Sequence, residues 1–421
     1  MKKAGFNPSA LFSASEQGAW YDPSDMSTLF QDSAGTTPCY QPGQGQVDPP
    51  VGRILDKSGR GNHATQTTTT SRPTLSARYN LLTATEFPNG ISDAPSRAGL
   101  VTASALPGYA GALAFGYDGV NTSYAYKAGS PASTTMTLSF VVKMDDGGAP
   151  SFGATSGAAN SDFALVLRNA SIPPATYQVV NLGGGYYRVS GTQASGVGND
   201  GNGIVKYAGN SPRTFKVTAF DLRPANDGVG LPPYQRVVDA NTYDTAGFPL
   251  YLKFDGVDDF LQTANIDFNG FGEVLVAAAI RKLSDSARGF VCELGADTSL
   301  SFGMSAPNGV NSTVSFYSRG TVQRAVEATR PAPVSLIAVG QGVIRDDILK
   351  VRINGVPAVS SSADQGTGDY YGNLPLFIGR RGGTSLPFNG RLYGLLIRGA
   401  ATPDATIDTL ERYLNSKAKI Y

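Results

Sequence analysis

Short segments of strand-forming residues, each closed by glycine, proline or asparagine, recur about every ten residues along much of this chain. Residues 135–143 are the clearest case, because Met136, Leu138 and Phe140 alternate with polar residues at the period of two that half-buried strands show. Glycine and proline together form about 18% of the chain, against roughly 12% in average proteins. This punctuation is typical of β-sandwiches, so we predict an all-β fold.

The strand-like segments fall into two series. The first covers residues 135–143, 163–167, 177–180, 186–190, 204–207 and 214–222; the second covers 250–254, 272–281, 299–304, 314–318, 334–339, 349–353, 376–379 and 391–398. Within the second series, Asn354 and Gly355 form a two-residue hairpin signal, because both tolerate positive φ. We therefore predict two jelly-roll β-sandwiches.

A single helix is predicted near the C-terminus. Thr402 is expected to cap it, Pro403 to take the first helical position, and Asp404 to complement the helix dipole. The apolar stripe at helical spacing consists of Ile407, Leu410 and Leu414. We expect this helix to cover the edge of the last sandwich, with contact to a neighbouring subunit as the alternative.

The composition excludes several classes of partner. Lys and Arg number 34 against 33 Asp and Glu, and no basic run is longer than Arg380-Arg381, so we expect no nucleic-acid partner. The longest apolar run, residues 274–280, has strand length and predicts no membrane insertion. No secretory signal is readable at the start of the sequence. The two cysteines, Cys39 and Cys292, leave a disulfide open and suit a reducing cytoplasm.

Three motifs carry a resemblance to a known family. They are WYDPSD at 20–25, DKSGRGNHA at 56–64 and FDGVDD at 254–259. The sequence resembles the concanavalin A-like (laminin-G-like) lectin/glucanase modules of phage virion and tail-associated proteins. Two further motifs, NLLTATE at 80–86 and GGYYRVS at 184–190, resemble a carbohydrate-binding-module-like jelly roll of the galactose-binding-like type.

The spacing of these motifs suggests that one module is inserted into the other, because an insertion is tolerated where the ends of the guest lie close together. Residues 21–79 and 230–421 would form a discontinuous concanavalin A-like sandwich. Residues 80–229 would form the inserted jelly roll. The first 80 residues are expected to supply strands but no core. Residues 1–20 are expected to be an attachment arm that orders on a partner.

The resemblance implies a function without catalysis. We expect a bacteriophage virion structural protein, a capsid- or tail-attached fibre or decoration component, assembled in the host cytoplasm and located in the virion. It would be a homo-oligomer that contacts other virion proteins and adheres to a host-surface glycan. The alternatives are a carbohydrate-binding lectin module outside any virion and, less favoured, a polysaccharide-degrading enzyme.

One loop has the composition of a glycan site. Exposed aromatic faces with Asp, Asn or Arg beside them commonly hold sugars, and the candidate set is Asp369, Tyr370, Tyr371, Asn373 and Arg380. Contact between subunits would use the same tyrosines. Tyr186-Tyr187 is richer in aromatic residues but has the pattern of a strand, so we expect at least one of its rings to be buried.

Catalysis and cofactors are not expected. The six glutamates never form the closely spaced carboxylate motif of lectin-like glucanases, although an Asp partner for Glu293 across a sheet is left open. Asp255 and Asp259 are weak Ca²⁺ candidates that would share one face of a strand, with Asp258 on the other. The favoured alternative is a turn of hydrogen-bonded aspartates. His63 is expected to be a structural hydrogen-bonding residue, and Trp20 a packing anchor.

Overall fold

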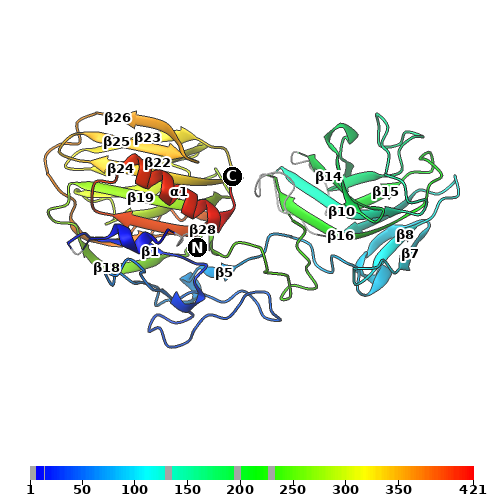
Figure 1. The fold of residues 1–421 in the computed structure, drawn as a ribbon, viewed down its shortest axis with the longest axis horizontal. Coiled ribbons are helices and arrows are strands. Elements are labelled where there is room, and N and C mark those ends of the chain that lie inside the picture. The colour runs from blue at the N-terminus through cyan, green and yellow to red at the C-terminus, as the bar shows by residue number, and fades with distance from the viewer. Residues whose placement is uncertain (1–5, 14, 129–134, 194–200, 226–232) are drawn as a thin grey trace, which may run out of the picture. The chain divides into compact units, whose positions relative to one another are not determined.

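The computed structural model describes the chain except for residues 1–5, 14, 129–134, 194–200 and 226–232. The chain divides into two compact units. Unit 1 consists of Met1–Pro42, Asp48–Ala77 and Pro249–Tyr421, and unit 2 of Gly43–Val47 and Arg78–Phe248. In Figure 1 the blue N-terminal strands therefore share unit 1 with the yellow to red C-terminal strands.

Unit 1 is a sandwich of two antiparallel sheets around one hydrophobic core. In spatial order, the eight-stranded sheet consists of β26 (Val356–Ser361), β25 (Ile348–Ile353), β24 (Val334–Val343), β19 (Glu273–Lys282), β28 (Asn389–Arg398), β17 (Tyr251–Asp255) and β5 (Thr74–Ser76), with β1 (Gly18–Tyr21) also paired to β28. The nine-stranded sheet consists of β2 (Leu29–Phe30), β3 (Arg53–Ile54), β4 (Ala64–Thr65), β18 (Leu261–Asp267), β27 (Asn373–Ile378), β20 (Phe290–Leu294), β21 (Ser301–Ser305), β22 (Thr313–Arg319) and β23 (Gln323–Thr329).

Strands from before unit 2 pair with strands from after it. β1 pairs with β28, β5 with β17, and β4 with β18. Each short strand lies in register on a longer one, so its apolar side chains reach the core between the sheets. The expectation that the first 80 residues supply no core is therefore wrong, as shown by the fully buried Ala19, Tyr21, Leu29, Ile54 and Leu75.

The described part of the segment before β1, which the sequence suggested as an attachment arm, packs on unit 1. It contains the 3₁₀ helix η1 (Pro8–Leu11), and Phe12 after it is only 8% exposed. Glu16 accepts two hydrogen bonds from Arg398, at 2.7 and 3.0 Å. These contacts join the segment to β28, and its role in attachment stays a prediction.

Unit 2 is a second sandwich. In spatial order, its six-stranded sheet consists of β13 (Gln178–Gly183), β14 (Tyr186–Gln193), β10 (Met136–Met144), β16 (Phe215–Pro224), β8 (Ala112–Phe115) and β7 (Val101–Ser104). Its five-stranded sheet consists of β12 (Ala170–Ser171), β11 (Ala164–Leu167), β15 (Asn202–Lys206), β9 (Ser123–Lys127) and β6 (Ser96–Ala98). The core between them is rich in stacked and tilted rings, including Phe140, Phe163, Phe215 and Phe220. The remaining 3₁₀ helices of the two units are η2 (Met26–Thr28), η3 (Thr69–Ser71), η4 (Gly90–Asp93) and η5 (Pro174–Thr176).

Unit 2 ends later than the sequence indicates. Its second boundary lies at Phe248, whereas the prediction closed the inserted jelly roll at residue 229. The reason is a set of buried bonds, because the side-chain Oε1 of Gln235 accepts from the backbone N–H groups of Tyr79 and Asn80 at 2.6 and 2.9 Å. The loop Gly43–Val47 joins unit 2 in the same way, since the Tyr243 N–H donates to the Gly43 carbonyl at 2.9 Å.

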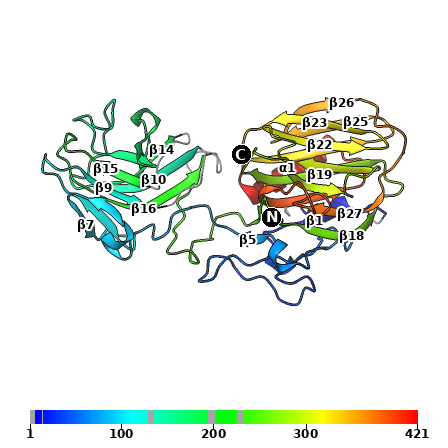
Figure 2. The ribbon, with the colours of Figure 1, turned by 180° about the vertical axis from the view of Figure 1, so that it is seen from behind.

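The single α-helix, α1 (Asp404–Ala418), lies on the outer face of the eight-stranded sheet, against β19, β24 and β28 (Figures 1 and 2). Ile407, Leu410 and Leu414 are buried, as their spacing predicts. The expected cap is wrong, however, because Pro403 occupies the N-cap position and the Thr402 hydroxyl instead accepts from Arg398 at 2.8 Å. The predicted fold class, all-β sandwiches with a C-terminal helix, is confirmed.

Candidate functional site

The strongest candidate for a binding site is a hollow of about 540 Å³ in unit 2, which we call the unit 2 hollow. Its walls come from the segment after Asn80, the loop between β7 and β8, the β13–β14 hairpin and the chain after β16. The residues that line it are Glu86, Pro107, Gly108, Tyr109, Leu182, Gly183, Tyr186, Tyr234, Arg236 and Asp244. The sequence analysis did not select this region as a site.

Two tyrosine rings form one side of the unit 2 hollow. Tyr186, at the start of β14, pairs with Lys143 on β10, which places both on the outer face of the six-stranded sheet. The rings of Tyr109 and Tyr186 lie 6.2 Å apart between centroids, tilted by 39°. The Tyr186 hydroxyl donates to the Pro107 carbonyl at 3.1 Å, and the Lys143 ammonium lies 4.6 Å from the ring centroid. These contacts fix a half-buried aromatic wall.

Glu86 supplies the buried charge of the unit 2 hollow. It is 7% exposed, and its Oε2 accepts from the Ala110 N–H at 2.9 Å. Its Oε1 accepts from the Tyr234 hydroxyl at 3.2 Å, and the Arg236 Nε lies 3.4 Å from Oε2. Burial raises the pKa of Tyr234 far above its usual range, so this phenol stays a donor. Burial and then the Glu86 charge raise the pKa of Tyr109 in the same way.

This arrangement suits the recognition of a neutral polar ligand. Rings with one polar end, together with a few fixed carboxylate and guanidinium groups, can pack on an apolar face and hydrogen-bond hydroxyl groups around it. The Glu86 carboxylate already contacts three groups, the Ala110 N–H, the Tyr234 hydroxyl and the Arg236 guanidinium, which fix its position beside the rings.

The predicted glycan loop does not form a site around both of its tyrosines. Tyr371 is fully buried in the unit 1 core, where its hydroxyl shares a 2.7 Å hydrogen bond with Ser318. Its ring meets Phe302 edge-on at 5.3 Å, so neither face is open to a sugar. Tyr370 is 41% exposed, and Asp369 beside it is exposed.

The other two predicted glycan residues are held apart along one strand. Asn373 is exposed and begins β27, whereas Arg380 lies beyond the opposite end of that strand. The Arg380 guanidinium donates to the Thr384 carbonyl at 2.9 Å and to the Asp258 carbonyl at 3.5 Å. The structure therefore brings Asp369 and Tyr370 together, but not Arg380.

The predicted cation candidates form a turn. The expectation that Asp258 points away from Asp255 and Asp259 is wrong, because β17 ends at Asp255 and Gly256 turns the chain with φ of 78°. One carboxylate oxygen of each aspartate lies within 4.8 Å of the others. Asp255 and Asp259 accept backbone N–H groups of the turn, and Asp258 accepts from Ser71 at 2.6 Å. These contacts fit the hydrogen-bonded turn; the same oxygens are those that a Ca²⁺ ion would use.

Glu293 is the glutamate for which a catalytic partner was left open. It is fully buried on β20, and its Oε1 accepts from the Tyr317 hydroxyl at 2.7 Å and pairs with Arg381 at 2.8 Å. Burial raises the pKa of the Glu293 carboxyl. In the described chain the Glu293 carboxyl is covered by protein and forms an ion pair with Arg381. A glycosidic bond could therefore not reach it.

The N-terminal motifs are structural. Asp56 accepts from the backbone N–H groups of Trp20 and Ser58, at 2.9 and 2.8 Å. His63 accepts from the Asp56 N–H through its Nδ1 at 2.9 Å, as expected for a structural histidine. Trp20 is 5% exposed, which confirms its role as a packing anchor. Both cysteines are buried and free.

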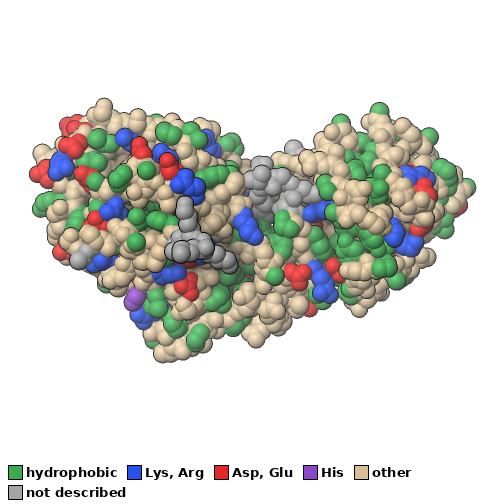
Figure 3. All heavy atoms as spheres, in the orientation of Figure 1, with side chains coloured by type: hydrophobic (Ala, Val, Ile, Leu, Met, Phe, Trp, Pro, Cys, Tyr) green, Lys and Arg blue, Asp and Glu red, His purple; other side chains and the backbone are tan. Residues whose placement is uncertain are grey.

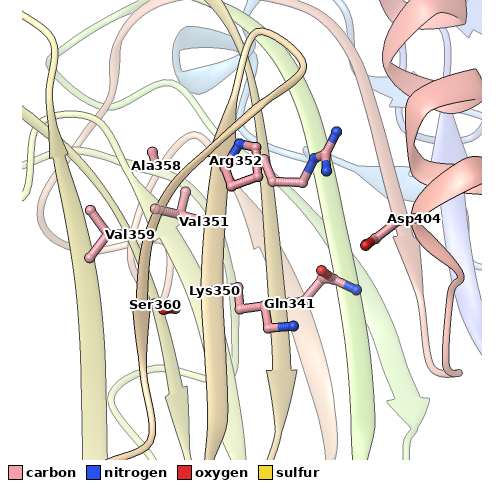
Figure 4. A pocket seen from close by; sticks show the side chains of 9 residues that line it. Gln341, Lys350, Val351, Arg352, Ala358, Val359, Ser360 and Asp404 are labelled. Atoms are coloured by element: carbon pink, nitrogen blue, oxygen red, sulfur yellow. The ribbon is translucent and has the colours of Figure 1, made fainter.

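A smaller hollow of about 280 Å³ lies in unit 1, between the β25–β26 hairpin and the start of α1. Gln341 and Asp404 turn toward each other across it (Figure 4). The Arg352 guanidinium extends toward α1, where it pairs with Glu411 at 2.9 Å. The described residues that line this hollow include no aromatic ring, so it offers hydrogen bonds without a surface for stacking.

Comparisons with known proteins give only distant structural similarity. No family model and no curated protein matches the chain. The CBM40 of the Ruminococcus gnavus IT-sialidase, solved with α2,3-sialyllactose, is 15% identical with a TM-score of 0.29, over 34% of this chain and 83% of that one. The botulinum neurotoxin serotype G binding domain is 10% identical with a TM-score of 0.33, over 41% and 44%. A heptameric SAP-like pentraxin from Limulus polyphemus is 13% identical with a TM-score of 0.31, over 38% and 80%.

At such low TM-scores these similarities carry no weight for function, and the fold class rests on the strands themselves. The part of the chain that the structure describes contains no helix with the length and hydropathy needed to cross a bilayer. On the face drawn in Figure 3, charged side chains of both signs are scattered among neutral ones. That face therefore offers no extended field of one sign.

Proposed function

We propose that this protein binds a carbohydrate through the unit 2 hollow and does not cleave it. The observation that carries the proposal is the wall of Tyr109 and Tyr186 beside the fixed carboxylate of Glu86. Sugars present apolar C–H faces and hydroxyl edges, and this combination of rings and acceptors matches both. The ligand class is a polysaccharide or glycan with an uncharged sugar at the contact.

A glycan array of host-surface polysaccharides, followed by calorimetric titration of the best ligand, tests this proposal on the full chain. We expect Tyr186→Ala to weaken binding at least about tenfold, because loss of ring contact costs about 1.5 kcal/mol. Tyr370→Ala is the matched control, since this exposed tyrosine lies on the loop that the sequence favoured. Equal losses in the two variants, or no glycan bound by the parent, would contradict the proposal.

A second experiment tests whether the protein cleaves its ligand. Incubation of the protein with its best ligand should release no new reducing ends, because Glu86 and Glu293 are both held in fixed hydrogen bonds. Release that disappears in Glu86→Gln would replace the binding proposal with a hydrolase.

The virion role stays a prediction, because it rests on the sequence resemblance alone. Mass spectrometry of purified particles tests it: a stoichiometric amount of this chain would support a structural component, and its absence from particles would leave a lectin outside the virion.

A further inference from the structure

Strand β13 is the exposed edge of the six-stranded sheet of unit 2. All six of its residues, QVVNLG, are exposed. The three apolar side chains Val179, Val180 and Leu182 are 41%, 42% and 49% exposed. The strand carries no charged residue and no proline, which are the devices that normally keep an edge from pairing with another chain.

The other sheet edges of the described chain are protected. β26 contains Pro357 and has a bulge opposite Val351 and Arg352, and β23 carries Arg324 and Glu327. The remaining edge strands, β1, β2, β5, β6, β7 and β12, are two to four residues long. β13 has one irregularity, between Asn181 and Gly183 beside the hairpin turn, so its first four residues stay regular.

The outer side of β13 offers a backbone ladder. An edge strand presents alternating N–H and C=O groups with no partner strand. Within the described chain, the one side-chain bond along this strand joins the Gly183 N–H to the Asn181 Oδ1 at 2.8 Å. No turn or loop of the described residues hydrogen-bonds to the backbone of residues 178–182. The ladder is therefore available to another strand.

We infer that β13 is the site where two copies of this chain pair, strand to strand and antiparallel about a two-fold axis. The axis passes near Val180, because Val179 and Val180 lie at the centre of the regular stretch 178–181. A two-fold axis brings the same patch of both copies together, and an antiparallel strand is complementary to itself under that rotation. The absence of charge along β13 means that no like charges meet when the copies approach. Val179 and Val180 point to opposite faces, so pairing shields apolar side chains on both sides of the joined sheet.

The dimer should be reversible. One pair of six-residue strands buries less surface than the roughly 1,200–2,000 Å² typical of stable interfaces. We therefore expect a dissociation constant in the micromolar range. Sedimentation velocity at protein concentrations from about 1 µM to about 100 µM should show a shift from monomer to dimer.

A charged substitution tests the strand directly. Val180→Lys should stay monomeric over the whole range, because it places two like charges near the axis. Val359→Lys is the matched control: Val359 is a 39% exposed valine on the protected edge strand β26. It should dimerise like the parent. A monomeric parent, a dimer that survives Val180→Lys, or a dimer lost in Val359→Lys would each overturn the inference.

A cysteine substitution gives a second readout that leaves the strand uncharged. Val180→Cys should form a disulfide-linked dimer under mild oxidation, whereas Val359→Cys should not. The native Cys39 and Cys292 are buried and will not compete. Cross-linking in both variants or in neither contradicts a two-fold at β13, and open-ended polymers would indicate a different pairing. Val180 does not line the unit 2 hollow, so glycan binding by Val180→Lys separates this inference from the proposed function.

Discussion

The two units cover the outer faces of their main sheets in different ways. In unit 1, α1 lies on the eight-stranded sheet and buries Ile407, Leu410 and Leu414 against it. In unit 2, the irregular segment 233–248 lies over outward-facing residues of β16. The Gln235 N–H donates to Asp221 at 3.0 Å, and Arg223 donates to the Pro233 carbonyl at 2.7 Å.

This difference shows where a binding site can arise. A helix packs side chains against a sheet at every turn and leaves little space. An irregular segment follows the hydrogen-bonding needs of its own backbone, and here it leaves the unit 2 hollow open at its side. The smaller hollow of unit 1 likewise lies beside the start of α1, where helical cover begins.

The largest expected effect breaks the helical cover. Leu410→Asp should destabilise unit 1 by about 5 kcal/mol or more, because it removes buried apolar surface and buries a carboxylate. The single tryptophan, Trp20, lies in unit 1, so its fluorescence during urea unfolding reports this unit. The urea concentration at the midpoint of the fluorescence change should fall sharply. Unit 2 should still bind its glycan at urea concentrations that unfold unit 1 of the variant. An unchanged fluorescence midpoint would contradict the prediction that packing of α1 on the sheet stabilises unit 1.

The next prediction compares a buried tyrosine of unit 1, Tyr371, with a half-buried tyrosine of unit 2, Tyr186. Tyr371→Ala should cost unit 1 about 3–4 kcal/mol, since it creates a cavity and leaves the Ser318 hydroxyl without its partner. Tyr186→Ala should change the free energy of unfolding of unit 1, followed by the same fluorescence, by less than about 0.5 kcal/mol, because this half-buried ring belongs to unit 2. Equal shifts in the two variants would mean that the units do not unfold separately.

The smallest expected effect concerns the turn after β17. Burial, together with the charge of Asp255, raises the pKa of Asp259 to about 7. Between about pH 4 and pH 7 the folded chain keeps a proton that the unfolded chain has released, so this group makes stability fall as pH rises. Asp259→Asn should remove that fall, so the variant should lose less stability than the parent between pH 5 and pH 8. Urea midpoints at pH 5 and pH 8 measure it.

Adding calcium to the same urea measurement tests whether the three aspartates form a cation site. If the three aspartates bind Ca²⁺, millimolar calcium should raise the midpoint of the parent at pH 8 and leave Asp259→Asn unchanged. Identical calcium responses in both proteins would place any bound ion elsewhere.

Much of the fold could be predicted from local pattern. Strands with alternating or continuous apolar residues, such as β10 and β19, lie within a few residues of their predicted positions. The Asn354-Gly355 hairpin is confirmed, with φ of 52° and 79°. Strands β18 and β23 escaped prediction because four of the seven residues in each are polar, which hides the apolar alternation. Tertiary pairing, which sequence spacing does not report, forms them.

The site was harder to predict for a related reason. The composition of the 369–373 loop suggested exposed rings, but Tyr371 has a buried donor site at Ser318 and lies in the core. Tyr186 begins a strand, and whether a strand residue faces core or solvent depends on what covers the sheet. The pattern GGYYRVS did hold one usable signal, because consecutive tyrosines on a strand must face opposite sides.

The loop Gly43–Val47 has a consequence for how this architecture could be rearranged. The chain crosses between the units at four junctions, because this loop visits unit 2 before the main insertion begins. A gene segment encoding residues 78–248 alone would leave behind Gly43, whose carbonyl accepts the Tyr243 N–H. Recombination that swaps guest modules between hosts must therefore carry both pieces, or repair the lost contact by mutation.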